Sequence, residues 1–303
     1  MELDSDTLAQ YVKAGRIAAK ALNHGARLIK EGAIIRDVLD KVEEYIAKQG
    51  AAPAFPAQIS LNAVAAHSCP AQEDETIFSH TDLVKLDVGV HVSGYIGDTA
   101  LTVNLDKENA EKELLVEASR AARDAAIKLV KAGVTPHELG AAIEHEIMTR
   151  GFKPVRNLSG HGLGQYQIHT VPSIPNFASS ERHALATGQV IAIEPFATTG
   201  KGLIYSSSGP TVFALKQLKP VRSPAAREVL EKIKEYNGLP FTERWLTRAF
   251  GAKAKLGLLE LRRVGILQEY PPLPEESKGL VSQSEHTLLV REDSCRILTL
   301  DDD

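Results

Sequence analysis

Asp87-Val-Gly-Val-His-Val-Ser-Gly-Tyr-Ile-Gly-Asp98 predicts two β-strands that fold back on each other at a tight turn near Ser93-Gly94. We expect this turn to bring Asp87 and Asp98 directly opposite each other, on one face of the ladder with Cβ atoms roughly 5 Å apart. Two carboxylates that close repel each other, and apolar surroundings make the repulsion costlier unless a positive charge lies between them. The segment therefore favours a bound divalent metal ion. The alternative is that one Asp caps a turn while the other is solvated.

Three further potential ligands lie far downstream, each beside an apolar run or a glycine turn. His161 lies in Leu158-Ser-Gly-His-Gly-Leu-Gly164, where flanking glycines allow close backbone approach and positive φ, so we expect a ligand presented from a tight turn. Glu194 closes an apolar run, and Pro195 then removes a donor from the ladder. Glu285 precedes another apolar run, where Glu is rarely buried without a partner. Taken singly, each could instead be a satisfied polar group of the core.

These residues make a ligand set of two Asp, two Glu and one His, without Cys. Oxygen donors with one imidazole suit Mn²⁺, Fe²⁺, Co²⁺ or Zn²⁺ better than a metal that prefers thiolates. Four carboxylates carry enough negative charge for two divalent ions, and two-metal sites activate water for hydrolysis. The ligands alone therefore predict a hydrolase with a dinuclear metal site.

Short motifs along essentially the whole chain resemble those of type 2 methionine aminopeptidases, which have the pita-bread fold. Besides the hairpin they are Ala54-Phe-Pro56, Ala66-His67, Gly160-His161-Gly162, Ile168-His169, Ile193-Glu194-Pro195, Tyr270-Pro-Pro-Leu273 and Ser284-Glu285-His286-Thr287. The resemblance implies that two divalent ions (Co, Mn, Fe or Zn) are bound by Asp87, Asp98, His161, Glu194 and Glu285. Asp98 and Glu285 would contact both ions. The implied activity is removal of the initiator methionine from nascent proteins with a small second residue.

The same resemblance implies which residues act on the substrate. His67 would contact the scissile peptide, His169 would assist the tetrahedral intermediate, and Glu194 would carry a proton as well as bind metal. Side chains in or near the methionine pocket would be Phe55, Ile168 and Tyr270. The residues alone leave other interpretations open: a packed strand histidine for His67, a loop residue for His169, and ordinary packing for the three pocket residues.

An internal repeat supports the fold without the resemblance. A shift of 101 residues places Ala21, Leu28, Lys30, Gly32, Glu43, Ile46, Gly50 and Pro53 on identical residues. We expect helices at 6–29 and 35–49 in the first copy, and at 111–131 and 136–150 in the second, where Thr135-Pro136 is a good helix start. Chance similarity of two amphipathic helix pairs is the alternative. We predict an α+β pita-bread fold, with duplicated helix-helix-strand units around a curved antiparallel sheet and a pseudo-two-fold relation.

A helical insertion is expected at residues 216–276, with helices at 223–236, 242–250 and 253–264. It resembles a winged-helix module, while residues 1–215 and 277–303 would form the pita-bread catalytic domain. Winged helices elsewhere often bind DNA, and the segment is rich in Lys and Arg. Glu residues interleave with these cations, which indicates a solvated helix face, so we expect no DNA binding.

The composition excludes several classes of protein. A net charge of −4 gives no nucleic-acid footprint, and two cysteines are too few for a disulfide framework. The acidic start of the chain lacks the apolar core of a signal peptide, and no apolar run reaches the roughly 18 residues of a membrane span. We expect a cytoplasmic monomer whose partners are the N-termini of nascent polypeptides, with the ribosome as one place to meet them.

Two other functions stay open. A prolidase or X-Pro aminopeptidase shares the fold and the ligand set but usually carries an additional N-terminal domain. A non-catalytic pita-bread binding protein has typically lost ligands, whereas all five ligand positions are intact here.

Overall fold

The computed structural model describes residues 3–301, so that residues 1–2 and 302–303 of the predicted catalytic domain lie outside the described part. Within it, two pairs of helices pack on the sheets. The first pair is α1 (Ser5–Leu28) and α2 (Ile35–Lys48), and the second is α3 (Ala110–Leu129) and α4 (Pro136–Thr149). The start of α4 is a capping box, in which Thr135 and Glu138 satisfy each other's backbone N–H groups. The predicted helices are therefore confirmed to within a few residues.

The repeat found in the sequence holds in three dimensions. Helices α2 and α4 begin and end at equivalent positions, and so do the short strands β1 (Ala52–Pro53) and β5 (Lys153–Pro154). Gly32 and Gly133, at equivalent places after α1 and α3, both have positive φ, 77° and 89°. That conformation lets each chain reverse before its next helix. The duplicated helix-helix-strand unit is confirmed.

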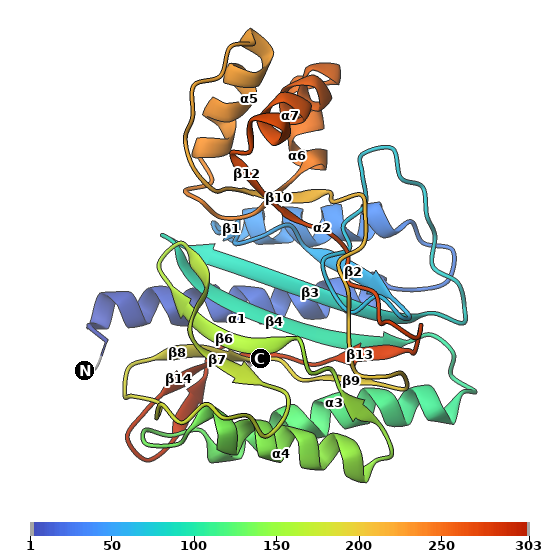
Figure 1. The fold of residues 1–303 in the computed structure, drawn as a ribbon, viewed down its shortest axis with the longest axis vertical. Coiled ribbons are helices and arrows are strands. Elements are labelled where there is room, and N and C mark those ends of the chain that lie inside the picture. Colours follow the sequence, from blue (N-terminus) through green and yellow to red (C-terminus); the bar gives the residue numbers. More distant parts are fainter. Residues whose placement is uncertain (1–2, 302–303) are drawn as a thin grey trace.

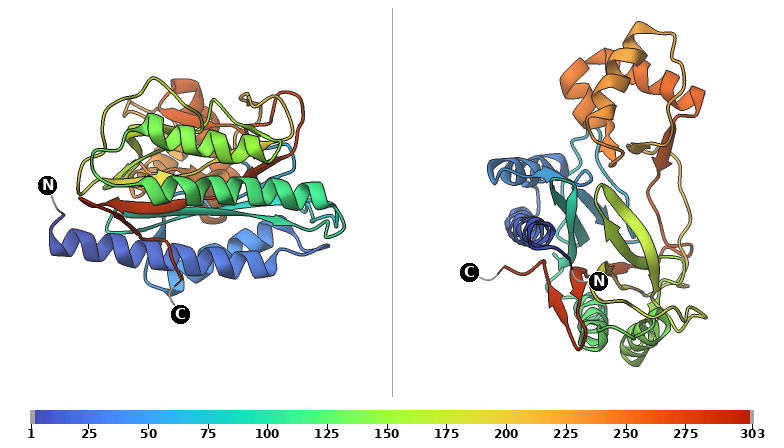
Figure 2. Two further views of the ribbon diagram at one scale, coloured as in Figure 1. Left: turned by 90° about the horizontal axis from the view of Figure 1, so that it is seen from below. Right: turned by 90° about the vertical axis from the view of Figure 1, so that its left-hand side faces the viewer.

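Antiparallel strands form the layer between the helix pairs (Figures 1 and 2). Strands β1, β2 (Gln58–Leu61), β3 (Leu83–Val92) and β4 (Tyr95–Asn104) form one sheet, whose apolar face packs against α1 and α2. A second sheet has the order β15 (Cys295–Ile297), β14 (His286–Val290), β8 (Val190–Ile193), β6 (Ser159–Gly164) and β7 (Gln167–Pro175), and it packs against α3 and α4. A third sheet joins β13 (Val281–Gln283), β9 (Phe196–Thr198) and β5.

Hydrogen bonds between β4 and residues 285–287 join the sheets where the two repeats meet. The Asp98 N–H donates to Thr287 Oγ1 at 2.8 Å, and the Glu285 N–H donates to the Ala100 carbonyl at 2.9 Å. Strand β4 of the first repeat therefore lies beside the β13–β14 segment of the second. Side chains from both repeats can meet on this shared surface.

The β3–β4 hairpin has the predicted turn but not the predicted pairing of its aspartates. Ser93 and Gly94 both have positive φ, and Val92 pairs with Tyr95. From this turn the register places Asp87 opposite Ala100 and Asp98 opposite Gly89. The expectation that the two aspartates lie directly opposite is therefore wrong by two residues. An offset of two keeps both on one face, as diagonal neighbours.

Three helices and three short strands form a separate layer at the top of Figure 1, here called the helical subdomain. Its elements are β10 (Val212–Leu215), α5 (Pro224–Lys234), β11 (Phe241–Thr242), α6 (Glu243–Phe250), α7 (Ala252–Val264) and β12 (Leu267–Tyr270). They enclose their own apolar core, which includes Phe213, Leu246 and Leu261. Strand β10 of this subdomain precedes residue 216, where the sequence predicted that the helical insertion begins. That domain boundary stays a prediction.

None of the helices within 3–301 has the length and apolar character needed to cross a membrane.

Candidate metal and substrate site

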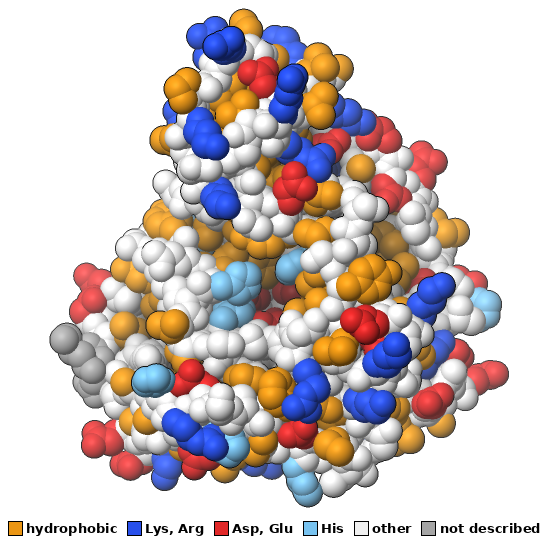
Figure 3. Space-filling model, in the orientation of Figure 1, with side chains coloured by type: hydrophobic (Ala, Val, Ile, Leu, Met, Phe, Trp, Pro, Cys, Tyr) orange, Lys and Arg blue, Asp and Glu red, His pale blue; other side chains and the backbone are white. Residues whose placement is uncertain are grey.

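One cavity of about 250 Å³ gathers all ten residues that the sequence nominated. Figure 3 shows a hollow below the helical subdomain, with histidine and acidic side chains in it. The acidic and histidine residues of its lining are Asp87, Asp98, His161, Glu194, Glu285, His67 and His169. The apolar and aromatic candidates in the same lining are Phe55, Ile168 and Tyr270. Most of the residues come from β3, β4, β6, β7 and from β12 or the positions just after β8 and β13, while Phe55 lies between β1 and β2 and His67 in the loop after β2, so the site depends on the whole fold.

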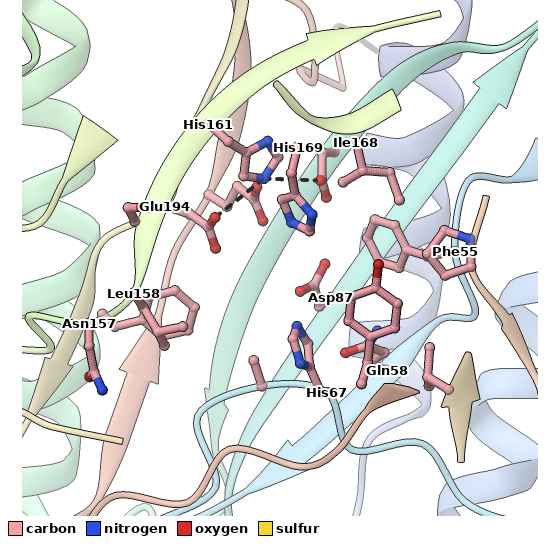
Figure 4. Close-up of a pocket in the computed structure, with 18 residues that line it drawn as sticks. Phe55, Gln58, His67, Asp87, Asn157, Leu158, His161, Ile168, His169 and Glu194 are labelled. Carbon is pink, nitrogen blue, oxygen red and sulfur yellow. Dashed lines mark ion pairs between the residues drawn. The ribbon is translucent and has the colours of Figure 1, made fainter. Parts of the chain in front are cut away.

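The five expected ligands all line this cavity, and Figure 4 labels His161, Glu194 and Asp87 among the side chains drawn there. His161 Nε2 lies 3.3 Å from Glu194 Oε1 and 3.9 Å from Asp98 Oδ2. Asp98, His161 and Glu285 each offer a ligand atom, and these atoms lie within 4.8 Å of one another. Asp87 lies diagonally across the hairpin from Asp98, on the same face.

The donor set fits divalent cations. Asp87 Oδ1 and Asp98 Oδ1 are buried and have no hydrogen-bond partner among the described residues. A buried carboxylate oxygen without a partner is costly, and a cation removes that cost. His161 Nδ1 lies 3.2 Å from the Gly162 carbonyl, and a proton on Nδ1 leaves Nε2 free to face the carboxylates. Oxygen donors with one such imidazole suit the divalent metals expected from the sequence.

The electrostatics show how strongly these carboxylates repel one another. Burial first, then the charges of Asp98 and Glu194, raise the pKa of Asp87 well above its usual range. Burial also raises the pKa of Asp98, to about 7, with His161 opposing and Glu194 adding to the shift. Burial and three neighbouring carboxylates raise the pKa of Glu285. Burial opposes charge on His161, but Glu194 and Asp98 prevail and raise its pKa.

His161 lies within strand β6, so the prediction of a tight turn with positive φ is wrong. Its flanking glycines serve close approach instead. A Cβ on Gly160 would lie 2.3 Å from the Ala192 carbonyl of β8, and one on Gly162 would lie 2.2 Å from the Val171 carbonyl of β7. Only glycine allows β6 to lie this close to both neighbours. The packing fixes His161 beside the end of β8, where Glu194 follows Ile193 as predicted.

The other two histidines also differ from the alternatives that the sequence left open. His67 belongs to no strand, and its φ is 63°, a conformation that is strained for a residue other than glycine. Its Nδ1 has no hydrogen-bond partner among the described residues, and burial lowers the pKa of its ring to about 4. His169 lies on strand β7, not on a loop, and its ring meets His161 edge-to-face with centroids 4.5 Å apart.

Phe55 and Ile168 belong to an apolar cluster that also includes Leu239 of the helical subdomain, and Tyr270 of the subdomain lines the same cavity. Phe55 packs so closely over the hairpin that a Cβ on Gly89 would lie 2.1 Å from its ring. Phe55 and Ile168 are both buried. The Tyr270 ring meets His67 edge-to-face with centroids 5.7 Å apart. An unbranched apolar side chain could enter beside the carboxylates.

Sequence patterns did not reveal how three polar residues lie against the expected ligands. Gln283 Nε2 donates to Asp87 Oδ2 at 3.4 Å, and the buried Gln58 pairs with Asp87 in the register of β2 and β3. Thr287 Oγ1 accepts from the Asp98 N–H and donates to the Asp98 carbonyl, both at 2.8 Å. Glutamine and threonine are common in strands, and only the pairing of strands gives them this role.

Comparison with known proteins agrees with this geometry. Residues 9–242 match the metallopeptidase family M24. The methionine aminopeptidase of Archaeoglobus fulgidus is 44% identical over 98% of this chain and 100% of its own length. The solved methionine aminopeptidase of Thermotoga maritima superposes with a TM-score of 0.74 at 22% identity, over 99% of this chain and 98% of that one. A thermophilic Arx1 superposes with a TM-score of 0.86 at 16% identity, over 98% of this chain and 91% of that one.

The two structural likenesses bear on the fold, which is the pita-bread fold predicted from the motifs. From the family match and the 44% identity, we conclude that the chain belongs to the methionine aminopeptidases of metallopeptidase family M24.

Proposed function

We propose that this protein removes the initiator methionine from polypeptides with a small second residue, using two divalent ions held by Asp87, Asp98, His161, Glu194 and Glu285. The observation that carries the proposal is the pair of buried oxygens, Asp87 Oδ1 and Asp98 Oδ1, that have no hydrogen-bond partner among the described residues, in a cavity that His161 and apolar side chains also line. Divalent ions bound there would acidify a water molecule and stabilise developing negative charge. We further propose that it acts in the cytoplasm, as a monomer, on nascent chains.

Each protein side chain has a part that follows from its position. Phe55, Ile168 and Tyr270 would surround the methionine side chain, whose flexible thioether suits an apolar wall. Glu194 directly follows strand β8 and lines the cavity, where it would accept a proton from the attacking water. His67 would contact the scissile peptide group. His169, beside His161, would donate a hydrogen bond to the oxygen that gains charge.

A direct assay tests this function against its two rivals. Purified protein supplied with Mn²⁺ or Co²⁺ should cleave Met-Ala-Ser and leave Ala-Pro peptides intact. Cleavage of Ala-Pro substrates alone would favour an X-Pro aminopeptidase. Tight metal binding without cleavage of either peptide would favour a binding protein.

The size of the second substrate residue should control turnover. Peptides Met-X-Ser with Gly, Ala, Ser, Cys, Pro, Thr or Val at X should be cleaved, and those with Leu or Lys should not. His67, His169 and His161 of β6 all line the cavity, and we propose that a large second residue of the substrate would clash with them. We expect kcat/KM to fall by about 10²-fold or more from Ala to Leu. Met-Ala-Leu is the matched control for overall size, and equal rates for Ala and Leu at X would contradict the claim.

Metal should stabilise the protein more as pH rises. At a pH below about 4, the usual pKa of these carboxyl groups in an unfolded chain, the carboxylates of the site are protonated in both the folded and the unfolded state. Their repulsion then costs the folded state nothing. As pH rises toward about 7, the pKa of Asp98, the metal-free fold must either hold protons or bear repelling charges, and it loses stability. Metal requires the ionised ligands and removes the repulsion.

The measurement is the shift in Tm on adding Mn²⁺ to metal-free protein at pH 5.5 and at pH 7.5. We expect the larger shift at pH 7.5. Glu285→Gln serves as the control, because it should melt higher than the wild type without metal at pH 7.5 and gain less from Mn²⁺. A shift independent of pH would show that these carboxylates do not bind the ion.

A further inference from the structure

The helical subdomain reaches the cavity through a small part of its surface. It supplies Val212, Pro240 and Tyr270 to the lining. Val212 of β10 pairs with Tyr270 of β12 on one side and with Thr242 of β11 on the other. One end of a three-stranded sheet therefore forms this wall, and any shift of that sheet changes the width of the cavity.

A buried ion cluster begins at Arg244, two residues after Thr242. Arg244, in the first turn of α6, has a fully buried side chain, and its guanidinium contacts Asp40 and Glu43 of α2. Nη2 lies 2.8 Å from Glu43 Oε1 and Nη1 lies 3.1 Å from Glu43 Oε2. The Trp245 indole N–H also donates to Glu43 Oε2, at 2.8 Å. Arg244, Asp40 and Glu43 are here called the Arg244 cluster.

The two parts of the chain that the Arg244 cluster joins have separate cores. Helix α2 packs its apolar face against β2 and β3, the sheet that carries Asp87. Helix α6 belongs to the core of the helical subdomain. A two-pronged contact between guanidinium and carboxylate fixes orientation as well as distance, which a single point charge does not.

A second connection ties the same sheet to the loop that carries His67. The Thr211 hydroxyl donates to the Cys69 carbonyl at 2.5 Å, and Cys69 Sγ lies 3.6 Å from Thr242 Oγ1. Tyr270 meets His67 ring to ring. The position of the subdomain therefore affects the apolar wall and His67 together.

We propose that the Arg244 cluster is a positioning device that sets the spacing between the helical subdomain and the catalytic core, and with it the fit of the substrate's first side chain. The proposal rests on the proposed methionine removal. Buried ion pairs add little net stability compared with apolar packing, whereas they can specify one arrangement of two packed parts. Arg244 touches no substrate and acts through Tyr270, Val212 and the His67 loop.

The test uses Arg244→Lys, which keeps the charge and loses the two-pronged contact, and the double variant Arg244→Met/Glu43→Gln, which leaves no unpaired charge from that pair. Tm, bound metal, kcat and KM are measured with Met-Ala-Ser and Leu-Ala-Ser. We expect KM for Met-Ala-Ser to rise about tenfold, with kcat changed less than about threefold. The ratio of kcat/KM for Met-Ala-Ser to kcat/KM for Leu-Ala-Ser should fall by about tenfold. In the double variant Tm should recover while KM stays high.

Lys255→Gln is the matched control. It removes an exposed ion pair between the same two parts, Lys255 Nζ to Glu73 Oε1 at 3.3 Å, and should leave KM and the Met preference unchanged. If the Arg244 variants keep the wild-type KM and the wild-type preference for Met over Leu while Tm falls, the Arg244 cluster only stabilises the fold, and the proposal is overturned. If both Arg244 variants fail to fold, Trp245→Phe, which removes the indole N–H bond to Glu43 and trims the ring that packs against Tyr236, decides by the same readout. A wild type that cannot cleave Met-Ala-Ser would contradict the proposed function instead.

Discussion

Asp98→Asn should lower kcat/KM for Met-Ala-Ser by about 10³-fold or more, since charge stabilisation by bound metal is worth several kcal/mol and each 1.36 kcal/mol is a factor of ten. Asp98 is buried between His161 and the other carboxylates, and its Oδ1 has no partner among the described residues. The amide keeps the size of the side chain but removes its negative charge. Its backbone bonds with Thr287 remain available, so we expect the fold to persist.

Metal content and circular dichroism of Asp98→Asn separate loss of metal from loss of fold. Asp293→Asn is the control, because Asp293 is exposed in the turn between β14 and β15. A variant that cleaves Met-Ala-Ser at nearly the wild-type rate would refute the assignment of Asp98 to the metal site. A variant that is inactive because it is unfolded would show that Asp98 matters for the hairpin, and Glu285→Gln would then serve as the second test of the ligands.

Local pattern was enough to predict those parts of the site that depend on a single segment. Glu194 and Glu285 stand out because a carboxylate at the edge of an apolar strand needs a partner. The helices followed from periodicity and caps, and Gly32 and Gly133 marked the repeat. In each case the physical cause lies within a few residues of its effect.

The features that the sequence could not give depend on contacts between distant segments. The offset of Asp87 and Asp98 is the exception, because it is local: pairs counted out from the Ser93-Gly94 turn place Asp87 opposite Ala100, and an error of two residues in that count leaves the apolar pattern unchanged. The glycines beside His161 matter because of the carbonyls of β7 and β8. The bond of Arg244 to Glu43 spans 201 residues of sequence, and no local pattern predicts that partner.

His169 differs from the five proposed metal ligands because its proposed role is to donate a hydrogen bond rather than to bind a metal ion. Its ring lies on β7 at the wall of the cavity, in edge-to-face contact with His161. Partial burial first, then the nearby His161 and His67, lower its pKa well below the usual range. The ring is therefore neutral at neutral pH and carries one N–H. A neutral donor can stabilise an oxyanion without drawing the carboxylates away from bound ions.

His169→Ala should accordingly keep its metal and its KM for Met-Ala-Ser while kcat falls. Removing one preorganised donor to an oxyanion typically costs roughly 2.7–4 kcal/mol, or about 10²–10³ in kcat. The interaction forms in the transition state, so substrate binding should change little. His145→Ala, on the exposed face of α4, is the control for loss of an imidazole. Steady-state kinetics with metal quantification decide the matter: a raised KM with unchanged kcat would mean that His169 only shapes the wall of the cavity, since the loss of an oxyanion donor must appear in kcat.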